Sequence, residues 1–215
     1  AANRAKTEFL QRMSHDIRTP INGICGMVDV GDHYSNDLQK QADCRKKIRE
    51  ASNILLELIN EVLDMSKLES GEILLEEKPF DVYKTINDVM DLVSRQADER
   101  GIKVEQTIEI EHRKLLGSSL YLKRMLMNIL SNAVKYNKDY GSIDLSCKEI
   151  PSHSTESTML EFTCRDTGIG MSSGFKEHVF ESFAREQKGG ASKFGGTGLG
   201  MTITKNLAEK MGGTI

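Results

Sequence analysis

The sequence has little that would suit a membrane. It contains no apolar run near the ~18 residues that a membrane span needs. Its charged start, AANRAKTEFL, lacks both an initiator methionine and the apolar stretch of a signal peptide. We therefore expect a piece of a longer protein that is cytoplasmic and makes no direct membrane contact. A membrane anchor of the parent protein could lie before residue 1.

The chain also lacks the signs of nucleic-acid binding and of metal-thiolate chemistry. It has no tryptophan, and 29 Lys and Arg against 32 Asp and Glu leave a net charge of −3, which argues against nucleic acid as a partner. The four cysteines form no CxxC pair and the five histidines are scattered, so we expect reduced thiols and no His- or Cys-based metal site.

Glycine and proline are scarce at the start, where residues 1–70 hold three glycines and one proline. Apolar residues recur at steps of three and four over 10–28 and over 48–65, which predicts two amphipathic helices. The polar stretch GDHYSND (31–37) predicts the turn between them. We assign residues 1–70 to an antiparallel helical hairpin that a second copy would bury as a dimeric four-helix bundle. The alternative is that the hairpin packs on the rest of its own chain.

The remaining sequence mixes helical and strand patterns, which makes the whole chain α+β. Ser70 and Gly71 end the second helix, and residues 71–80 are read as a linker or hinge with a first strand near 73–75. Residues 81–215 predict a mixed α/β layer domain. Its expected helices are 82–99, 120–136 and 197–211, and its expected strands are 102–110, 142–150 and 158–164.

The first candidate site is SHDIRTP (14–20), inside the first helix. His15 lies ~200° around the helix from the apolar stripe, so its imidazole should face solvent. An exposed imidazole is a competent nucleophile near neutral pH, and Asp16 could take or orient its proton. Thr19 shares the face of His15, and Pro20 loosens the helix close by. Alone, an exposed histidine on a helix is more often incidental.

Two further patterns suit a bound nucleotide. Asn128, Asn132 and Lys135 share one helix face, and amide oxygens with an ammonium suit a magnesium-bound polyphosphate. Asp166 opens DTGIGM after a predicted strand, where its carboxylate could accept a hydrogen bond from an exocyclic amine. Each pattern alone is also compatible with a solvated helix face or a strand-ending turn.

A glycine-rich loop, GGTGLG (195–200), opens the last predicted helix. Backbone amides at a helix N-terminus form an anion site that suits phosphates. No Gly-Lys-Ser/Thr follows, which excludes a Walker A loop, and no early strand–loop–helix unit supports a dinucleotide fingerprint.

In this order, the motifs resemble those of sensor histidine kinases over essentially the whole chain. EFLQRMSHDIRTPINGI (8–24) is similar to their H box, NILSNAVKYN (128–137) to their N box, and DTGIGM (166–171) to their G1 box. HVFESFAREQ (178–187) is similar to the F box that opens the ATP lid, and GGTGLGM (195–201) to the G2 box. The resemblance implies a dimeric helical hairpin followed by an α/β sandwich ATP-binding domain of the superfamily that includes Hsp90 and gyrase.

The resemblance also implies a reaction. ATP with Mg²⁺ would phosphorylate His15, helped by Asp16, and the phosphoryl group would pass to an aspartate of a response-regulator receiver domain. Thr19 would position water when the protein dephosphorylates that partner. Residues 1–70 would form the homodimer.

The nucleotide contacts implied by the resemblance come from the N, G1 and G2 boxes. Asn132 would ligate Mg²⁺, with Asn128 and Lys135 on the phosphates. Tyr136 would lie near the nucleotide, and Asp166 would read the adenine amine. The full implied set is Asn128, Asn132, Lys135, Tyr136, Asp166, Gly168, Gly170, Gly196, Thr197, Gly198, Leu199 and Gly200.

Two departures from the family pattern leave alternatives open. The loop before the N box reads LGSS (116–119), where many relatives have Gly-Asp, and the chain stops at Ile215, before the strands that end the family's sheet. One alternative is a sensor that acts mainly as a phosphatase through Thr19. Another is a nucleotide-binding dimerisation scaffold with weak catalysis, and a third is an Hsp90-like ATPase in which His15 is incidental.

Overall fold

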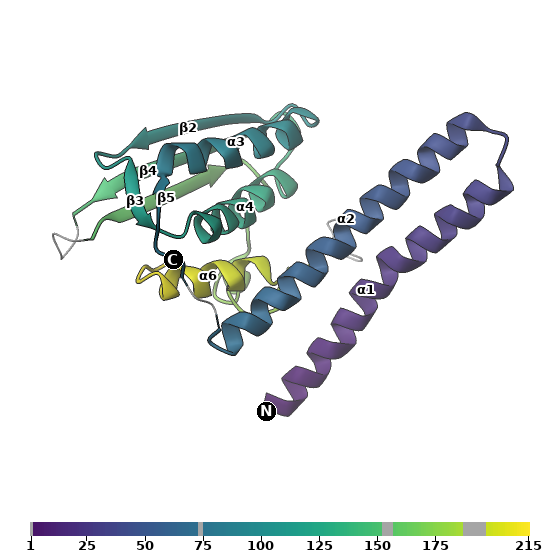
Figure 1. Cartoon of the computed structure of the whole chain (residues 1–215), viewed down its shortest axis with the longest axis horizontal. Helices are drawn as coiled ribbons and strands as arrows, with labels where there is room; N and C mark the ends of the chain where they lie inside the picture. Colours follow the sequence, from purple (N-terminus) through teal and green to yellow (C-terminus); the bar gives the residue numbers. More distant parts are fainter. Residues whose placement is uncertain (1, 73–74, 152–156, 187–196) are drawn as a thin grey trace. The chain divides into compact units, whose positions relative to one another are not determined.

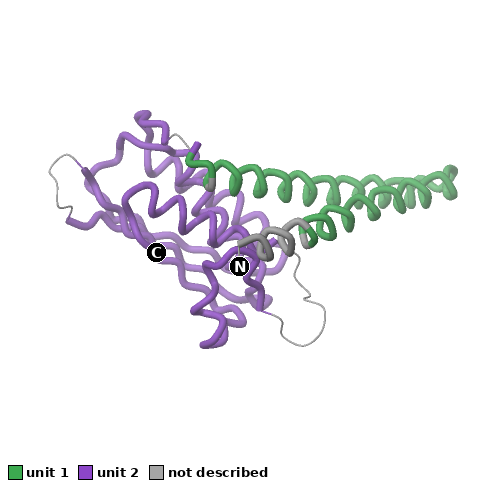
Figure 2. The backbone as a smooth tube through the Cα atoms, turned by 90° about the horizontal axis from the view of Figure 1, so that it is seen from below, with its two compact units in different colours: residues 1–71 green, residues 72–215 purple. Residues whose placement is uncertain are grey.

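The computed structural model describes residues 2–72, 75–151, 157–186 and 197–215 (Figure 1). The chain divides into two compact units, residues 1–71 and residues 72–215 (Figure 2). Each unit has its own elements and its own packing, so each is described by itself.

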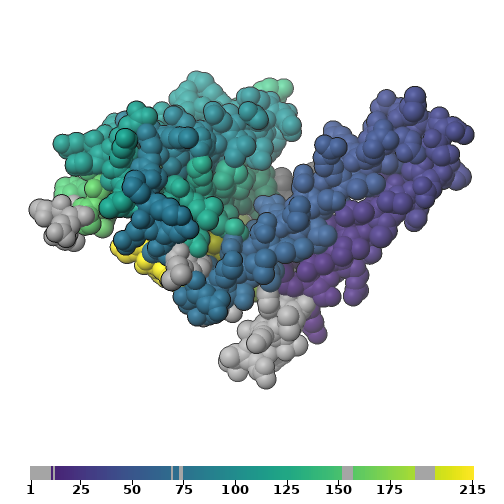
Figure 3. All heavy atoms as spheres, in the orientation of Figure 1, coloured from purple at the N-terminus to yellow at the C-terminus, as the bar shows by residue number. Residues whose placement is uncertain are grey.

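The first unit is an antiparallel helical hairpin, as the sequence predicts. Helices α1 (Ala2–His33) and α2 (Leu38–Glu69) pack side by side (Figure 3). At the turn, the carboxylate of Asp37 accepts a hydrogen bond from the backbone N–H of Lys40 at 3.0 Å and so caps α2. Gln41 closes the turn by donating from its side-chain amide to two backbone carbonyl oxygens.

The hairpin leaves much of its apolar surface uncovered within one chain. Met13, Cys44 and Leu58 are buried at 5 to 7% exposure. Large apolar side chains that stay exposed on the same two helices are Ile21, Val28, Ile54, Leu56, Ile59 and Leu63. The apolar stripe is therefore wider than one helix–helix contact covers. Among the helices that the structure describes, none has both the length and the apolar character that a membrane crossing demands.

The second unit combines two small sheets with helices. In its described residues, β1 (Lys78–Asp81) pairs antiparallel with β3 (Lys114–Gly117). A second sheet has the order β2-β4-β5, with β2 parallel to β4 and β4 antiparallel to β5. Its strands are β2 (Lys103–Glu109), β4 (Ser142–Ile150) and β5 (Met159–Asp166), and the helices of the unit are α3 (Val82–Asp98), α4 (Ser119–Lys135), the short α5 (Ser173–Lys176) and α6 (Gly200–Lys210).

The core of this unit lies where α3 and α4 cover one face of the three-stranded sheet (Figure 1). Ile143, Leu145 and Cys147 alternate along β4 and are at most 3% exposed. Burial raises the pKa of the Cys147 thiol to about 11, so this sulfur is a packing group and not a nucleophile. The helices contribute the buried side chains of Ile86, Val89, Val93, Leu126 and Leu130. Each such side chain contributes about 1.5–3 kcal/mol, which holds α4 and its polar face in place.

Several boundaries differ from the sequence predictions. Residues 31–33 of the expected turn continue α1, which ends at His33. The first strand is Lys78–Asp81, whereas residues 73 and 74 of the strand expected near 73–75 lie outside the described residues. Residues 116 and 117, expected in a loop, belong to β3, because their backbone pairs with the distant β1 and no local pattern reveals that pairing. Helix α6 begins at Gly200 and not at residue 197, since residues 197–199 form irregular backbone that leads into it.

A histidine–glutamate contact ties the loop after β2 to the end of β4. Nδ1 of His112 lies 2.6 Å from Oε1 of Glu149, whose Oε2 accepts the backbone N–H groups of Glu111 and His112. The side-chain hydrogen bond with Glu149 raises the pKa of His112. The backbone and ring hydrogen bonds from His112 lower the pKa of Glu149. Both shifts favour the charged pair.

We expect this contact to make stability depend on pH. Because the folded pKa of His112 is raised, its contribution is complete below the ordinary value of 6.5 and is lost as pH rises through the folded pKa. An NMR titration of the ring should give a higher pKa in the wild type than in Glu149→Gln, whose amide oxygen can still accept the backbone N–H groups. The free energy of unfolding should also fall more in the wild type between about pH 6 and about pH 8. Equal pKa values of His112 in the two proteins would contradict this prediction.

Candidate functional site

The first candidate residues lie on the exposed face of α1. The side chain of His15 is 80% exposed, which confirms the predicted direction, and its Nδ1 lies 3.2 Å from Oδ1 of Asp16. When the N–H of Nδ1 donates a hydrogen bond to that carboxylate, the lone pair of the imidazole is on Nε2, where an electrophile can reach it. The hydroxyl of Thr19 donates to the backbone carbonyl of His15 at 3.1 Å. Pro20 follows within the helix and, as a proline, offers no N–H to the carbonyl of Asp16.

The polar face of α4 is tied to the start of α6. The side-chain amide of Asn128 donates to the backbone carbonyl of Gly200 at 2.9 Å and to the hydroxyl of Thr204 at 3.2 Å. These bonds hold the N-box helix against the G2-box helix, a role for Asn128 that the sequence did not reveal. Its contact with the phosphates stays a prediction.

Asn132, Lys135 and Tyr136 lie together over the last turn of α4, and all three are half-buried. The ammonium of Lys135 lies 4.9 Å from the centroid of the Tyr136 ring, a distance that gives a cation–π contact. The backbone carbonyl of Tyr136 accepts the N–H of Ile169 at 3.0 Å. The last turn of the N box therefore touches the G1 box directly.

The G1 loop is packed so closely on α4 that glycine is required at one position. Asp166 ends β5, and its Oδ1 accepts the backbone N–H of Gly168 at 2.8 Å. A methyl group at Gly168 would stand 2.5 Å from the carbonyl oxygen of Tyr136, so a larger residue would push the loop off the helix. Because one oxygen of the Asp166 carboxylate is held in this turn, the direction of the other oxygen is set as well.

A hydrogen-bond network around the buried Asn137 joins the same loop to the end of α4. Asn137 is 3% exposed, and its Oδ1 accepts the hydroxyl of Thr167 at 3.1 Å. Its Nδ2 donates to the carbonyl of Ser142 at 3.0 Å, and the N–H of Ser142 donates to Thr167 at 2.8 Å. Sequence reasoning did not single out these three residues, although Asn137 and Thr167 stand inside the N and G1 motifs. They fix Asp166 relative to Lys135 and Tyr136.

The described part of the G2 loop, residues 197–199, leads into the N-terminus of α6. Gly198 has φ +75° and packs on the backbone of Phe183, which donates its N–H to the Gly198 carbonyl at 3.0 Å. The hydroxyl of Thr197 accepts the N–H of Leu199 at 3.1 Å. In the described residues, the N-cap Leu199 makes no side-chain capping bond to α6, and backbone amides at such a helix start suit a phosphate. Gly196 lies outside the described residues.

The donor set suits a magnesium ion that arrives with a nucleotide. The described residues contain no group of three or more His, Cys, Asp or Glu side chains placed to hold a metal. Mg²⁺ commonly takes one or two protein oxygens and completes its shell with phosphate oxygens and water. Asn132, a half-buried residue whose side chain carries an amide oxygen, fits such a single protein ligand.

Comparisons of the chain with known families agree with this geometry. Residues 5–71 match the His Kinase A (phospho-acceptor) domain, and residues 117–215 match the histidine kinase-, DNA gyrase B- and HSP90-like ATPase domain. The chain is 35% identical to the sensory/regulatory protein RpfC of Xanthomonas campestris pv. campestris; the match covers all of this chain and 29% of RpfC. It is 34% identical to the signal transduction histidine-protein kinase BarA of Escherichia coli K12; the match covers all of this chain and 23% of BarA. It thus spans less than a third of these relatives.

Solved structures show the same architecture. Full-length ShkA in complex with AMPPNP matches with a TM-score of 0.68 and 27% identity, over 95% of this chain and 41% of that one. The histidine kinase ThkA in complex with the response regulator protein TrrA matches with a TM-score of 0.66 and 21% identity, over 96% of this chain and 55% of that one. The second likeness concerns the fold alone.

Proposed function

This chain, a phospho-acceptor hairpin followed by a histidine kinase-type ATPase domain, belongs to the histidine kinases, and we propose that it transfers the γ-phosphoryl group of ATP to His15. The observation that carries the proposal is the exposed imidazole whose Nδ1 lies 3.2 Å from Asp16. An ATPase that hydrolyses nucleotide with water has no need of such a pair. The group would then pass to an aspartate of a response-regulator receiver domain.

The chemistry at the hairpin follows from the His15–Asp16 contact. Nε2 of His15 attacks the γ-phosphorus in line, the N–P bond forms, and the bond to the bridging oxygen of ADP breaks with its electron pair leaving on ADP. Positive charge develops on the ring, and the carboxylate of Asp16 stabilises the proton on Nδ1. The product is a phosphoramidate. The hydroxyl of Thr19, one helical turn away, becomes free when it releases the backbone carbonyl of His15.

The nucleotide would lie across the second unit, where the three boxes meet. We propose that Asp166 accepts the adenine amine and that the first turn of α6 binds phosphate oxygens. Asn132 would hold Mg²⁺, with Lys135 beside it on the phosphates. The ion supplies neutralisation of the charge that develops on the transferred group. The likeness to ShkA, which was solved in complex with AMPPNP, supports nucleotide binding by this chain.

We propose that residues 1–70 form a homodimer in which the uncovered apolar side chains of α1 and α2 are buried. Exposures of 53% for Ile54, 58% for Leu56 and 51% for Leu63 are large for one hairpin in water. A second hairpin supplies the missing cover as a four-helix bundle. Because the donor is ATP, we place this part of the protein in the cytoplasm.

The test is incubation of the purified chain with Mg²⁺ and either γ-labelled or α-labelled ATP. Label should enter the protein only from the γ-phosphate, and the bond should be labile in acid and stable in base, as a phosphoramidate is. Release of phosphate without protein labelling would identify a water-directed ATPase instead. Nucleotide binding with neither product would identify a scaffold.

A further inference from the structure

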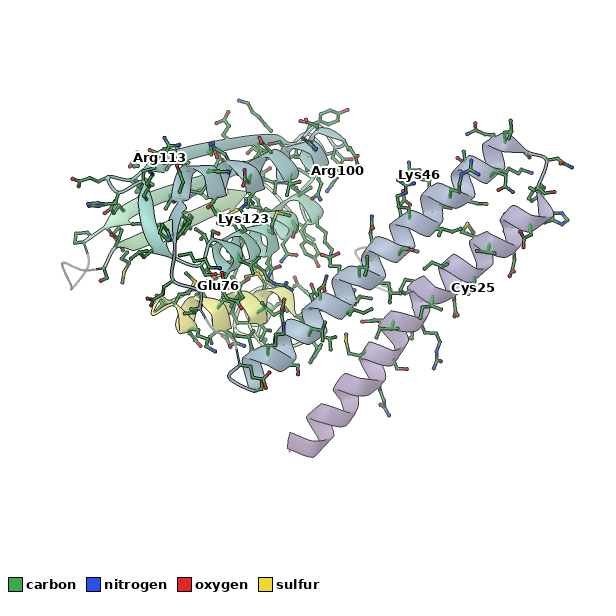
Figure 4. The ribbon with its side chains drawn as sticks, in the orientation of Figure 1. Cys25, Lys46, Glu76, Arg100, Arg113 and Lys123 are labelled. Carbon is green, nitrogen blue, oxygen red and sulfur yellow. The ribbon has the colours of Figure 1, made fainter. Side chains whose placement is uncertain are left out.

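We infer that Arg100 is a positioning residue for the nucleotide site, an inference that rests on the proposed function. Arg100 follows α3, and its guanidinium reaches the end of α4 (Figure 4). Nη1 donates to the backbone carbonyls of Val134 at 2.5 Å and of Lys135 at 3.4 Å. Nη2 donates to the carbonyl of Asn137 at 2.7 Å, and Nε donates to the carboxylate of Asp139 at 2.9 Å.

These contacts add charged donors to the end of α4, where the carbonyl of Val134 also accepts the backbone N–H of Asn137 at 3.3 Å. The last carbonyls of a helix have no N–H partner within it and carry partial negative charge. A guanidinium presents several N–H donors in a fixed planar fork, so it can serve several carbonyls at once, whereas an ammonium cannot match that geometry. The tie is reciprocal, because the backbone N–H of Tyr140 donates to the carbonyl of Arg100 at 3.1 Å.

Arg100 binds the last turn of α4, and this turn carries residues that are proposed to contact the nucleotide. The carbonyl of Lys135 accepts a hydrogen bond from Arg100, and its ammonium, 4.9 Å from the centroid of the Tyr136 ring, is the group proposed to bind the phosphates. The backbone carbonyl of Asn137 accepts a hydrogen bond from Arg100, and its side-chain Oδ1 accepts the hydroxyl of Thr167 at 3.1 Å. Arg100 is thus linked through Asn137 and Thr167 to Asp166, the residue expected to read adenine. The guanidinium acts on the site through these residues, which makes its role one of positioning.

The experiment compares nucleotide affinity and autophosphorylation kinetics of the whole chain in matched variants. Arg100→Ala should weaken binding of AMPPNP with Mg²⁺ by about tenfold, since bonds to a charged donor are lost where the site is anchored. The KM for ATP should rise by a similar factor, while kcat changes by less than about twofold. Arg100→Lys should recover part of the affinity, because one ammonium serves fewer carbonyls.

Two controls separate positioning from a general loss of stability. Arg113→Ala removes an arginine that contacts Asp81 at 2.7 Å, at the other end of α3 (Figure 4), and it should leave the affinity unchanged even if it lowers the melting temperature. Asp139→Asn removes the ion pair of Arg100 and spares the three carbonyl contacts, so it should change the affinity by less than about twofold.

Each outcome decides between the two ideas. Wild-type affinity in a folded Arg100→Ala protein would overturn the inference and leave the proposed function intact. If Arg100→Ala fails to fold by circular dichroism, Arg100→Lys decides, and an unchanged KM in that variant overturns the inference. Equal losses in Arg100→Ala and Arg113→Ala would show a structural role only, which also overturns it. A wild type that binds no nucleotide would overturn the proposed function together with this inference.

Discussion

Replacing His15 with glutamine is expected to reduce phosphorylation of the chain from γ-labelled ATP by about a thousandfold or more, because the attacking lone pair is removed. The affinity for ATP should not change, since the nucleotide motifs lie in the other unit. Nitrocellulose filter counting of labelled protein and calorimetric titration of AMPPNP measure the two quantities. Label that persists at wild-type level in His15→Gln would place the phosphoryl group on another residue.

Two variants sharpen this result. His33→Gln alters another exposed histidine of α1, and it should be labelled like the wild type. Asp16→Asn keeps the shape of the side chain but weakens its hold on the developing positive charge of the ring. It should retain labelling at a rate reduced by about a hundredfold. The series His33→Gln, Asp16→Asn, His15→Gln therefore predicts a graded loss that a general unfolding of the hairpin would not produce.

The hairpin could be predicted from the sequence because its signals are local. Apolar spacing predicts the helices, and the stretch 31–37 marks the position of the turn, although residues 31–33 continue α1 and Asp37 caps α2. The exposure of His15 follows from its angle on the helix. The pairing of β1 with β3 could not be predicted, because the register of Lys78 with Gly117 depends on chain that is remote in sequence.

The candidate site shows the same division. The motifs name residues that would touch a nucleotide, and the second unit does bring the N, G1 and G2 boxes together. The residues that hold these boxes in place were not visible. Arg100 lies in ERGI, without a motif around it, and Asn137 becomes important only through Thr167 and Ser142. Such supports are defined by contacts between distant segments, for which a single sequence carries no local pattern.

Replacing Asp166 with asparagine is expected to weaken ATP binding by about a hundredfold. It should also lower the preference for ATP over GTP. In the wild type, one carboxylate oxygen accepts the N–H of Gly168 at 2.8 Å, and the other can accept the adenine amine. In Asp166→Asn the single amide oxygen stays with Gly168, and an NH₂ donor then faces the adenine amine, which is also a donor. The lost charged hydrogen bond and the unpaired donors amount to ~3 kcal/mol.

The change in base preference separates this effect from damage to the fold. Guanine carries a carbonyl oxygen where adenine carries its amine, so the new NH₂ donor has a partner in GTP and none in ATP. Competition of unlabelled ATP and GTP for a fluorescent nucleotide should show the ATP to GTP affinity ratio falling in Asp166→Asn. Asp144→Asn, on the exposed side of the neighbouring strand opposite Arg165, should keep the wild-type ratio. If both affinities fell equally in Asp166→Asn, its carboxylate would be holding the turn at Gly168 and would not be reading the base.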